Sequence, residues 1–369
     1  MRIGLLAPPW VAVPPIGYGG TEAVVDTLAR GLAAAGHEPR LFTVGTSTCP
    51  VPRRWYFDAP VSPMNTSLEE AAHVLAGYDE LSGVDVIHDH TTIGPAVAGP
   101  QHPAGPPVVT TYHNPFTRDS RTVVRLNCRY SRLIAISRSH ARHSGDVPVG
   151  AVIPHGIDVA RHPFGGGGGG YLVWIGRMTA EKGAARAVRL ARRDGRPLVL
   201  IGKMRTPEER ACFTDEVRPL LRRADTVMVE PPKQVLLAVL AGADALLNPI
   251  DWEEPFGMVM IEAQACGTPV VATPRGAAPE LIDPGVTGFL ASTDDDLLTA
   301  LRTVADLDRR ACRAWVAERY SAERMVADHV AFYRRVLGRS RTADPGGAGH
   351  PADVALAAFG PRQRPAVSA

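Results

Sequence analysis

Lysine is scarce in this sequence of 369 residues: Lys182, Lys203 and Lys233 are the lysines among 40 basic residues, so arginine carries almost all of the positive charge. The five cysteines are scattered and form no Cys-x-x-Cys pair, which argues against a disulfide framework and indicates free thiols. No apolar run reaches the roughly 18 residues of a transmembrane helix. With a formal net charge of +2, nothing indicates a nucleic-acid partner. We expect a cytoplasmic protein whose contact with a membrane, if any, is peripheral and on the inner face.

Short apolar runs alternate with longer segments of helical periodicity along most of the chain. In the first half, strands are predicted at residues 3–6, 41–44, 84–88, 108–111, 133–136 and 149–153. In the second half, they are predicted at residues 171–175, 198–201, 227–229, 245–247 and 270–272. These runs are continuously apolar rather than alternating, which is typical of parallel strands buried on both faces. The pattern predicts the α/β class, with two doubly wound, Rossmann-like domains.

Glycine and proline mark the boundaries of the predicted domains. We expect an N-terminal domain over residues 1–158, a glycine-rich linker over 159–170, a second domain over 171–321, a helix over 322–338 and a disordered tail over 339–369. The glycine run at 165–170 formally matches G-x-G-x-x-G, but a strand follows it rather than preceding it, so a flexible linker is the better interpretation. Two such domains imply a deep cleft between the carboxyl ends of two sheets, where ligands usually bind.

Two glutamates, Glu254 and Glu262, flank an apolar run in the second domain. Pro255 disfavours helical geometry at Glu254 and so places it in a loop. Residues 257–266 predict a helix that carries Glu262, and the free N–H groups near Gly257 and Met258 would point at an anion. Most isolated glutamates are solvated surface residues, so the pair by itself does not decide the function.

Two cations follow the first predicted strand of the second domain. Arg177 lies at the strand end and Lys182 at the entrance of the next helix, and two cations beside a helix N-terminus suit a diphosphate. The alternative is two solvated charges. In the first domain, Gly19 and Gly20 precede a helix at 21–35 and would let the backbone approach a ligand closely, although a plain turn would use the same residues.

Histidines follow two predicted strands of the first domain. His88, Asp89 and His90 form a compact triplet, which supplies too little coordination geometry for us to expect a metal. His113 and Asn114 are candidate contacts to a sugar or an acceptor, with a structural histidine as the alternative. The sequence therefore predicts no metal and no other cofactor.

These residues belong to a larger set of motifs that occur in a fixed order. The set comprises Gly19-Gly20, His113, Ala135-Ile136-Ser137-Arg138-Ser139, Pro154-His155-Gly156-Ile157-Asp158, Gly176-Arg177 to Lys182-Gly183, Glu254 to Glu262, and Pro279-Glu280 to Thr287-Gly288-Phe289. With these motifs, residues 3 to about 337 resemble the retaining glycosyltransferases of family 4 (glycosyl transferases group 1), which have the two-domain GT-B fold. The chain departs from the family at His155, where asparagine is usual, and at residues 229–232 near the base pocket, so the resemblance leaves the nucleotide open.

The resemblance implies an enzyme of the EC 2.4 class that transfers a hexose or related sugar. Its donor would be a nucleoside-diphosphate sugar, with a UDP-sugar favoured over a GDP-sugar, and its acceptor a small molecule, a glycan or a lipid-linked acceptor in cell-wall or natural-product glycosylation. Transfer would retain the anomeric configuration without a metal. The N-terminal domain would bind the acceptor, the second domain the donor, and the last helix would cross back to the first domain.

The resemblance also assigns roles to single residues. Arg177 and Lys182 would hold the diphosphate, Glu254 the transferred sugar and Glu262 the ribose, while His113 would face the reaction centre. The catalytic set is therefore Arg177, Lys182, Glu254 and His113. The donor-binding set is Gly19, Gly20, Arg177, Lys182, Glu254, Phe256, Gly257, Met258, Val259 and Glu262.

Other functions remain open at this point. A glycosidase would also use two carboxylates, but it would leave Arg177, Lys182 and the glycine loop without roles. A phosphorylase of the GT-B class would cleave a glycan with phosphate, and a non-catalytic sugar-nucleotide binding protein would bind the donor without turnover. An activity assay, rather than a sequence motif, distinguishes each of these functions from sugar transfer.

Five arginines recur at spacings of three and four residues in the first domain, after His113 and before the predicted linker. A helix would gather them into one basic stripe. A solvated face is the favoured interpretation, and contact with an anionic acceptor or membrane surface is the sharper hypothesis. The residues are Arg118, Arg121, Arg125, Arg129 and Arg132.

Overall fold

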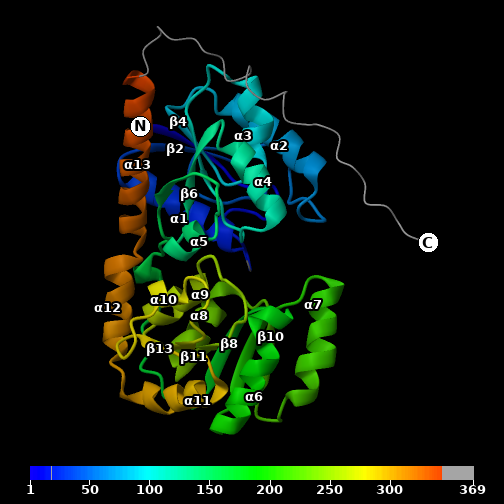
Figure 1. Cartoon of the computed structure of the whole chain (residues 1–369), viewed down its shortest axis with the longest axis vertical. Coiled ribbons are helices and arrows are strands. Elements are labelled where there is room, and N and C mark those ends of the chain that lie inside the picture. Colours follow the sequence, from blue (N-terminus) through cyan, green and yellow to red (C-terminus); the bar gives the residue numbers. More distant parts are fainter. Residues whose placement is uncertain (18, 343–369) are drawn as a thin grey trace, which may run out of the picture.

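The computed structural model describes residues 1–17 and 19–342 and consists of two α/β units, one above the other in Figure 1. The first unit contains a seven-stranded sheet in the order β3-β2-β1-β4-β5-β6-β7, and the second a six-stranded sheet in the order β10-β9-β8-β11-β12-β13. Neighbouring strands of both sheets pair in parallel. The predicted class, two doubly wound parallel sheets, is confirmed.

The strands coincide closely with the apolar runs of the sequence. In the first sheet they are β1 Arg2–Leu6, β2 Glu38–Thr43, β3 Arg53–Trp55, β4 Val86–Asp89, β5 Val108–Thr111, β6 Ser131–Ala135 and β7 Val149–Val152. In the second sheet they are β8 Leu172–Arg177, β9 Leu198–Lys203, β10 Thr226–Val229, β11 Ala245–Asn248, β12 Val270–Ala272 and β13 Gly288–Leu290. The sequence missed β3 and β13. Each is an edge strand of 3 residues; β3 contains two arginines, and β13 consists of Gly288 and two apolar residues.

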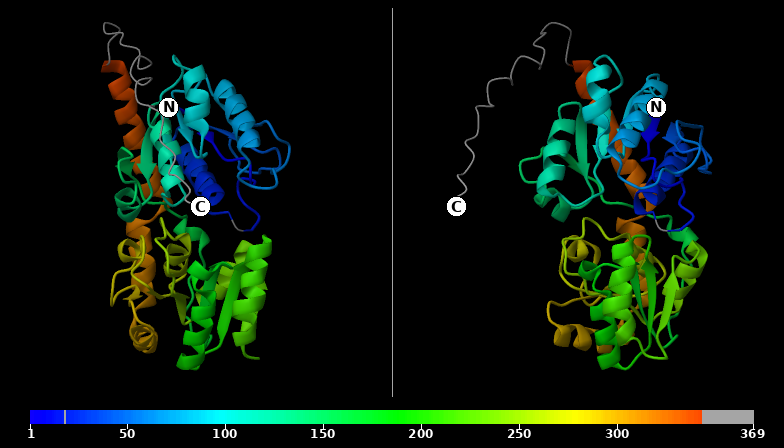
Figure 2. Two further views of the ribbon diagram at one scale, coloured as in Figure 1. Left: turned by 45° about the vertical axis from the view of Figure 1, so that its right-hand side comes forward. Right: turned by 90° about the vertical axis from the view of Figure 1, so that its right-hand side faces the viewer.

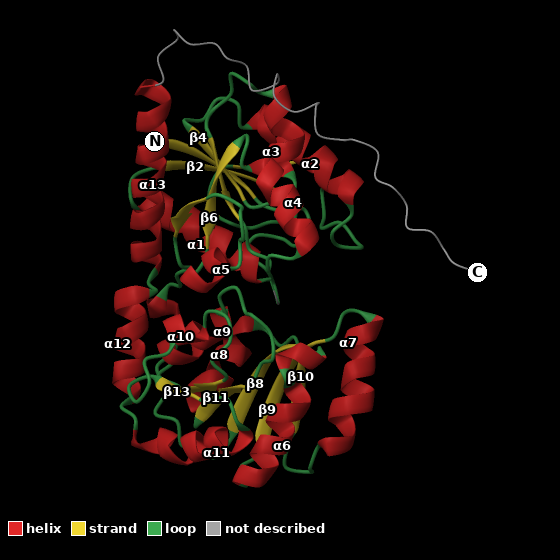
Figure 3. Ribbon diagram, viewed as in Figure 1, coloured by secondary structure: helices red, strands yellow, loops and turns green. Residues whose placement is uncertain are grey.

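Helices lie on both faces of each sheet (Figure 3). The first unit contains α1 Gly20–Ala34, α2 Ser67–Glu80, α3 Gly94–Ala98, α4 Arg118–Asn127 and α5 Arg138–Arg142, with a 3-10 turn at Gly99–Gln101. The second unit contains α6 Ala184–Asp194, α7 Pro207–Cys212, α8 Lys233–Gly242, α9 Met258–Ala265, α10 Ala278–Leu281, α11 Asp294–Thr303 and α12 Arg309–Arg319. Its short turns are Val159–Arg161, η3 Ala180–Lys182, Phe213–Val217, Arg218–Leu220 and Val304–Asp306.

Each sheet separates two apolar cores, because successive side chains of a strand point to opposite faces. On β8, for example, Val173 packs in the core that contains α8 and α9, whereas Leu172 and Trp174 pack in the core that contains α6 and α11. The fully buried Trp174 also donates its Nε1–H to the Lys182 carbonyl at 3.0 Å, which fixes the turn after the strand. The buried core thereby positions the loop at the carboxyl edge of the sheet.

The last helix, α13 Ala322–Thr342, runs back along the first unit and packs against α1 (Figures 1 and 2). A Cβ atom on Gly31 of α1 would lie 2.5 Å from the Val326 side chain, so glycine allows the two helices to approach closely. The helix extends beyond the expected residue 338 to Thr342, the last described residue, and residues 343–369 of the predicted tail lie outside the described residues. No helix within the described ranges is long and apolar enough to span a membrane.

The glycine run is not a free linker in the structure. The Gly165 N–H donates to the Cys266 carbonyl at 3.0 Å and the Gly169 N–H to the Gly242 carbonyl at 3.0 Å. Arg309 donates its Nε–H to the Gly165 carbonyl at 3.0 Å. These contacts place the run against the second unit.

The predicted single stripe of five arginines is also wrong. Helix α4 ends at Asn127, so Arg129 and Arg132 lie outside it. At this end the buried Asn127 side chain turns inward, accepts the Ala96 N–H at 3.0 Å and donates to the Thr92 carbonyl at 2.9 Å. Of the remaining members, Arg121 donates to the His143 carbonyl and Arg125 pairs with Asp146.

Candidate functional site

Lys182 is the centre of a buried polar cluster at the carboxyl edge of the second sheet. Its ammonium forms an ion pair with Glu254 and lies 4.2 Å from the centre of the Trp252 ring. The Trp252 Nε1–H donates to the same carboxylate oxygen, Glu254 Oε2, at 3.1 Å. Burial lowers the pKa of Lys182 and Arg177 acts in the same direction, whereas the Glu254 carboxylate opposes both. The structure therefore brings together two of the predicted site residues and adds an indole that the sequence analysis missed.

Arg177 ends β8 beside this cluster. Its guanidinium carbon lies 6.0 Å from the centre of the Trp252 ring, and the same guanidinium is 3.6 Å from the Glu181 carboxylate. In the parallel register Arg177 is opposite Lys203, the last residue of β9. Two basic side chains therefore leave neighbouring strands at the same edge of the sheet.

Glu262 is paired with the remaining lysine. The Lys233 ammonium lies 2.5 Å from the Glu262 carboxylate, whose side chain is 13% exposed, so the alternative of a solvated glutamate is excluded. Lys233 begins α8, directly after β10 and its following loop. All three lysines of the chain therefore lie near the carboxyl edge of the second sheet. Their scarcity was the only sequence signal for Lys233.

The loop and helix between the two glutamates are held in one conformation. Gly257 caps α9 with φ 96°, in the left-handed region that favours glycine. Glu254 is fixed through its backbone, because the Ala277 N–H donates to its carbonyl at 2.9 Å. The first N–H groups of α9, from Gly257, Met258 and Val259, point out of the helix start and have no carbonyl of an earlier turn to bind. Such a helix start attracts an anion.

Contacts with the first unit lie directly on this loop. The Ser137 hydroxyl donates to the Pro255 carbonyl at 2.7 Å, and the edge of the buried Phe256 ring lies against His155 at 5.0 Å between centroids. Glu280 accepts the backbone N–H groups of Arg138 and Ser139 at the start of α5, at 2.9 and 2.6 Å. The candidate site is therefore built where the carboxyl edges of both sheets meet.

The glycine loop of the first unit faces the same region. Gly19 precedes α1, and Gly20 is its first residue. The neighbouring Glu22 is buried, which raises its pKa to about 7, while the positive charges of Lys203 and Arg205 lower that pKa. Both basic residues belong to the second unit. The start of α1 therefore lies near the carboxyl edge of the second sheet, where Arg177 ends β8.

His113 belongs to a group of neutral imidazoles on the first unit. It is half-buried, shares a hydrogen bond of 2.9 Å with His90 and stacks on His155 at 5.1 Å between centroids. Burial lowers the pKa of His113 to about 3, with His140 and His329 acting in the same direction. Within residues 1–17 and 19–342, no group of three or more histidine, cysteine, aspartate or glutamate side chains has the arrangement of a metal site.

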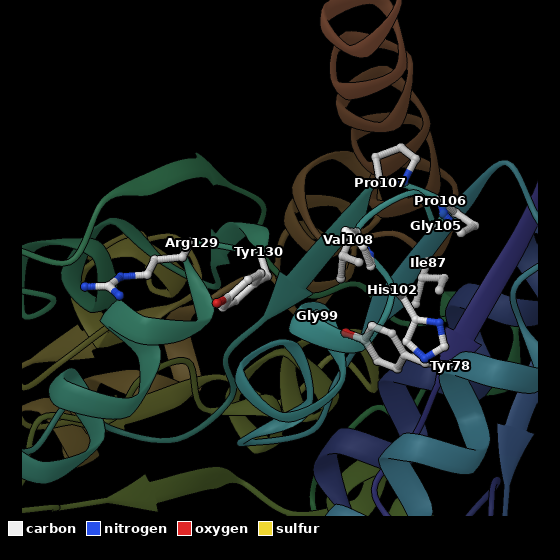
Figure 4. Close-up of a pocket in the computed structure, with 11 residues that line it drawn as sticks. Tyr78, Ile87, Gly99, His102, Gly105, Pro106, Pro107, Val108, Arg129 and Tyr130 are labelled. Carbon is white, nitrogen blue, oxygen red and sulfur yellow. The ribbon is translucent and has the colours of Figure 1, made fainter. Parts of the chain in front are cut away.

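Two cavities lie outside this cluster. One of about 240 Å³ lies at the amino ends of β4 and β5, between Tyr78, His102 and Tyr130 (Figure 4). Because parallel sheets bind ligands at their carboxyl edges, this cavity is at the wrong edge for the site. A second, of about 340 Å³, is lined by Thr179 and Asp251, beside the loop that carries Lys182.

Comparisons with known proteins agree with this arrangement. The family model described as Glycosyl transferases group 1 matches residues 169–306, and that described as Glycosyltransferase Family 4 matches residues 18–161. The chain is 28% identical to the glycogen synthase of Mycobacterium tuberculosis over 362 residues, which cover 79% of this chain and 84% of the synthase.

Solved structures share the fold over nearly the whole chain. AviGT4, described as a glycosyltransferase involved in avilamycin A biosynthesis, matches with a TM-score of 0.68 at 25% identity, over 91% of this chain and 98% of that one. HepE from Anabaena, solved in complex with UDP-glucose, matches with a TM-score of 0.69 at 18% identity, over 93% of this chain and 100% of that one.

Proposed function

The chain belongs to the glycosyl transferases group 1 family and is a glycosyltransferase with two Rossmann-like domains of GT-B type, and from that premise we propose which reaction it performs. The donor is a nucleoside-diphosphate sugar, with a UDP-sugar favoured over a GDP-sugar. The acceptor is a hydroxyl of a small molecule, a glycan or a lipid-linked acceptor. Transfer retains the anomeric configuration and uses no metal.

One observation carries this proposal: a buried lysine and a strand-end arginine lie beside the start of α9, at the place where both units meet. Lys182 and Arg177 supply positive charge, and the first N–H groups of α9 add further donors. A leaving nucleoside diphosphate develops negative charge as its bond to the sugar breaks. Cations and amides that are already in place stabilise that charge without reorganisation.

In the proposed step, the bond between the anomeric carbon and the β-phosphate oxygen breaks, and the electron pair stays on that oxygen. The acceptor oxygen bonds to the same carbon, and its proton passes to the released diphosphate. Lys182 and Arg177 bind the diphosphate, Glu254 binds hydroxyls of the transferred sugar, and Glu262 binds the ribose. His113 contacts the sugar as a neutral imidazole, because its pKa of about 3 keeps it uncharged at neutral pH.

The preference for UDP rests on a relative of the same fold. HepE was solved with UDP-glucose, at 18% identity to this chain. Thermal-shift measurements with UDP-, GDP- and ADP-sugars test the preference, because a ligand that binds the folded state raises the unfolding temperature by mass action. A larger shift with GDP- or ADP-sugars than with UDP-sugars would reject it.

Substitutions of the paired residues test the role of the site. We expect Lys182→Ala and Glu254→Gln each to lower kcat/KM for release of UDP from UDP-glucose by more than about tenfold, the scale of a lost charged transition-state contact. Arg192→Ala is the matched control, because it removes an exposed cation from the neighbouring helix α6. Wild-type rates in either site variant, or complete loss of wild-type activity with chelator, would contradict the proposal.

We further propose a peripheral contact with anionic membrane through α4 and the turn after it. Arg118 at the start of the helix, Arg125 near its end and Arg129 in the turn are exposed, and Leu126 and Tyr130 beside the last two are 41% and 38% exposed. Exposed cations and apolar side chains together suit an acidic lipid surface. Charge reversal of the three arginines should abolish co-sedimentation with phosphatidylglycerol vesicles. Unchanged sedimentation, or equal wild-type binding to neutral vesicles, would reject the contact.

A further inference from the structure

Trp252 contacts both members of the Lys182–Glu254 pair. The indole face lies 4.2 Å from the Lys182 ammonium, and its Nε1–H donates to Glu254 Oε2 at 3.1 Å. Trp252 and Glu254 come from the loop between β11 and α9, whereas Lys182 comes from the loop between β8 and α6. The half-buried indole therefore connects two loops that approach from different strands.

We propose that Trp252 is a positioning residue, which holds the Lys182 ammonium under its ring and the Glu254 carboxylate at its N–H in the geometry that the donor requires. This inference rests on the sugar-transfer function proposed above. It assigns the indole two separate actions, one through its face and one through its N–H.

The action on Glu254 concerns which oxygen remains for the sugar. Both Lys182 Nζ and the Trp252 Nε1–H bind Oε2. Among the described residues no hydrogen bond to Oε1 is present, so this oxygen can accept a hydroxyl of the transferred sugar. Without the indole N–H, the carboxylate would rotate about its last bond and lose that orientation.

The action on Lys182 concerns its charge while the donor binds. Burial lowers the pKa of Lys182, and the donor diphosphate competes with Glu254 for the ammonium. An aromatic face attracts the cation without a negative charge of its own. The ring therefore favours the protonated lysine both when the ammonium is paired with Glu254 and when it binds the diphosphate. A further carboxylate in place of the ring would hold the ammonium away from the diphosphate.

Two substitutions separate the actions. Trp252→Phe keeps an aromatic face and removes the N–H, whereas Trp252→Leu removes both. The chain also offers a matched control in Trp315, whose ring lies 4.0 Å from the Arg319 guanidinium and whose Nε1–H donates to the Leu281 carbonyl at 3.1 Å. Trp315→Phe and Trp315→Leu remove the same two kinds of contact on α12.

Activity is measured as release of UDP from UDP-glucose between pH 6 and pH 10. We expect Trp252→Phe to lower kcat about tenfold with an unchanged alkaline limb, the scale of one lost positioning contact. Trp252→Leu should in addition move the alkaline limb of kcat/KM to lower pH by about half a unit to one unit, from the lost cation–π attraction. An alkaline limb of Trp252→Leu that coincides with wild type, or effects of equal size in the Trp315 variants, would overturn the proposal.

A second measurement needs no donor and separates failure of this inference from failure of the function. Thermal unfolding of wild type, Lys182→Met, Trp252→Leu and the double variant forms a double-mutant cycle. We expect the two shifts to be non-additive by about 2 °C or more, because the residues are in contact. Additive shifts would refute the positioning role even in an active enzyme. An inactive wild type with non-additive shifts would refute the proposed function alone.

Discussion

Acid should destabilise this protein through its buried histidines, and His73 offers the cleanest test. Its ring is fully buried between Phe42 and Phe57, at 4.9 and 6.2 Å between centroids, and its Nε2–H donates to the Ala7 carbonyl at 2.9 Å. Burial lowers its pKa to about 4, and no charged group contributes to that shift. Glutamine at this position keeps an N–H donor for Ala7 and removes the titration.

The size of the effect follows from proton linkage. The pKa of His73 is about 4 when folded and 6.5 in a model peptide, so the unfolded chain binds the extra proton between these values. The stability that the neutral ring contributes is present above pH 6.5 and is lost as the pH falls toward 4. Between pH 7.5 and 5.5, one such histidine lowers the free energy of unfolding by about 1.3 kcal/mol.

Other buried groups titrate over the same range. His140 and His329, with pKa values of about 4, and His113, with about 3, change stability in the same direction as His73. The raised pKa of Glu22 has the opposite effect, because its folded form takes up the proton first. A comparison between wild type and variant cancels the contributions that the two proteins share.

The assay is urea unfolding at pH 7.5, 6.5 and 5.5, followed by circular dichroism. We expect His73→Gln to lose about 1.3 kcal/mol less than wild type between the two end values. His143→Gln, which replaces an exposed imidazole on the same unit, should show the wild-type loss. Identical pH dependence in wild type and His73→Gln would refute the argument from burial.

Two further predictions concern the site. Gly276→Ala should lower kcat/KM for UDP-glucose by at least about tenfold, because its Cβ would lie 2.2 Å from the Glu254 backbone. Gly285→Ala has a similar positive φ of 81° but open space around it, so it should cost only about 1 kcal/mol of unfolding free energy and leave the rate unchanged. Equal rates in both variants would contradict this reasoning. The affinity for UDP, measured by calorimetry, should fall as the pH rises through about 7, because Glu22 then ionises near the proposed diphosphate position. Glu22→Gln should flatten that dependence, and an unchanged pH profile would remove Glu22 from the site.

Local pattern was enough to predict most of the fold. Short continuous apolar runs became β1, β9, β11 and β12, because a strand buried on both faces requires continuous apolar sequence. The edge strands β3 and β13 were not predictable in this way. A short edge strand is held by pairing with its one neighbour, and its 3 residues are too few to show a pattern of their own.

Helix α4, which begins at Arg118, is an element whose length the sequence pattern overestimated. The spacing of the arginines suggested a stripe that continued to Arg132, but the helix ends at Asn127, whose buried side chain binds Ala96 and Thr92. These contacts join the end of the helix to another part of the first unit. Spacing along the chain contains no information about them.

For the site, the sequence by itself determined which residue types were present and in which order. Arg177, Lys182 and Glu254 were identifiable because they end or follow strands at the edge where parallel sheets bind ligands, and Glu262 because it lies on the helix that begins directly after Glu254. Only the tertiary structure decided how they pair. It placed the indole of Trp252 over Lys182 and brought Glu254 to both. The physical reason is that Lys182 and Glu254 are 72 residues apart and Lys233 and Glu262 are 29 residues apart, so the distance within each pair is set by the packing of strands and helices in the second unit and not by local preference.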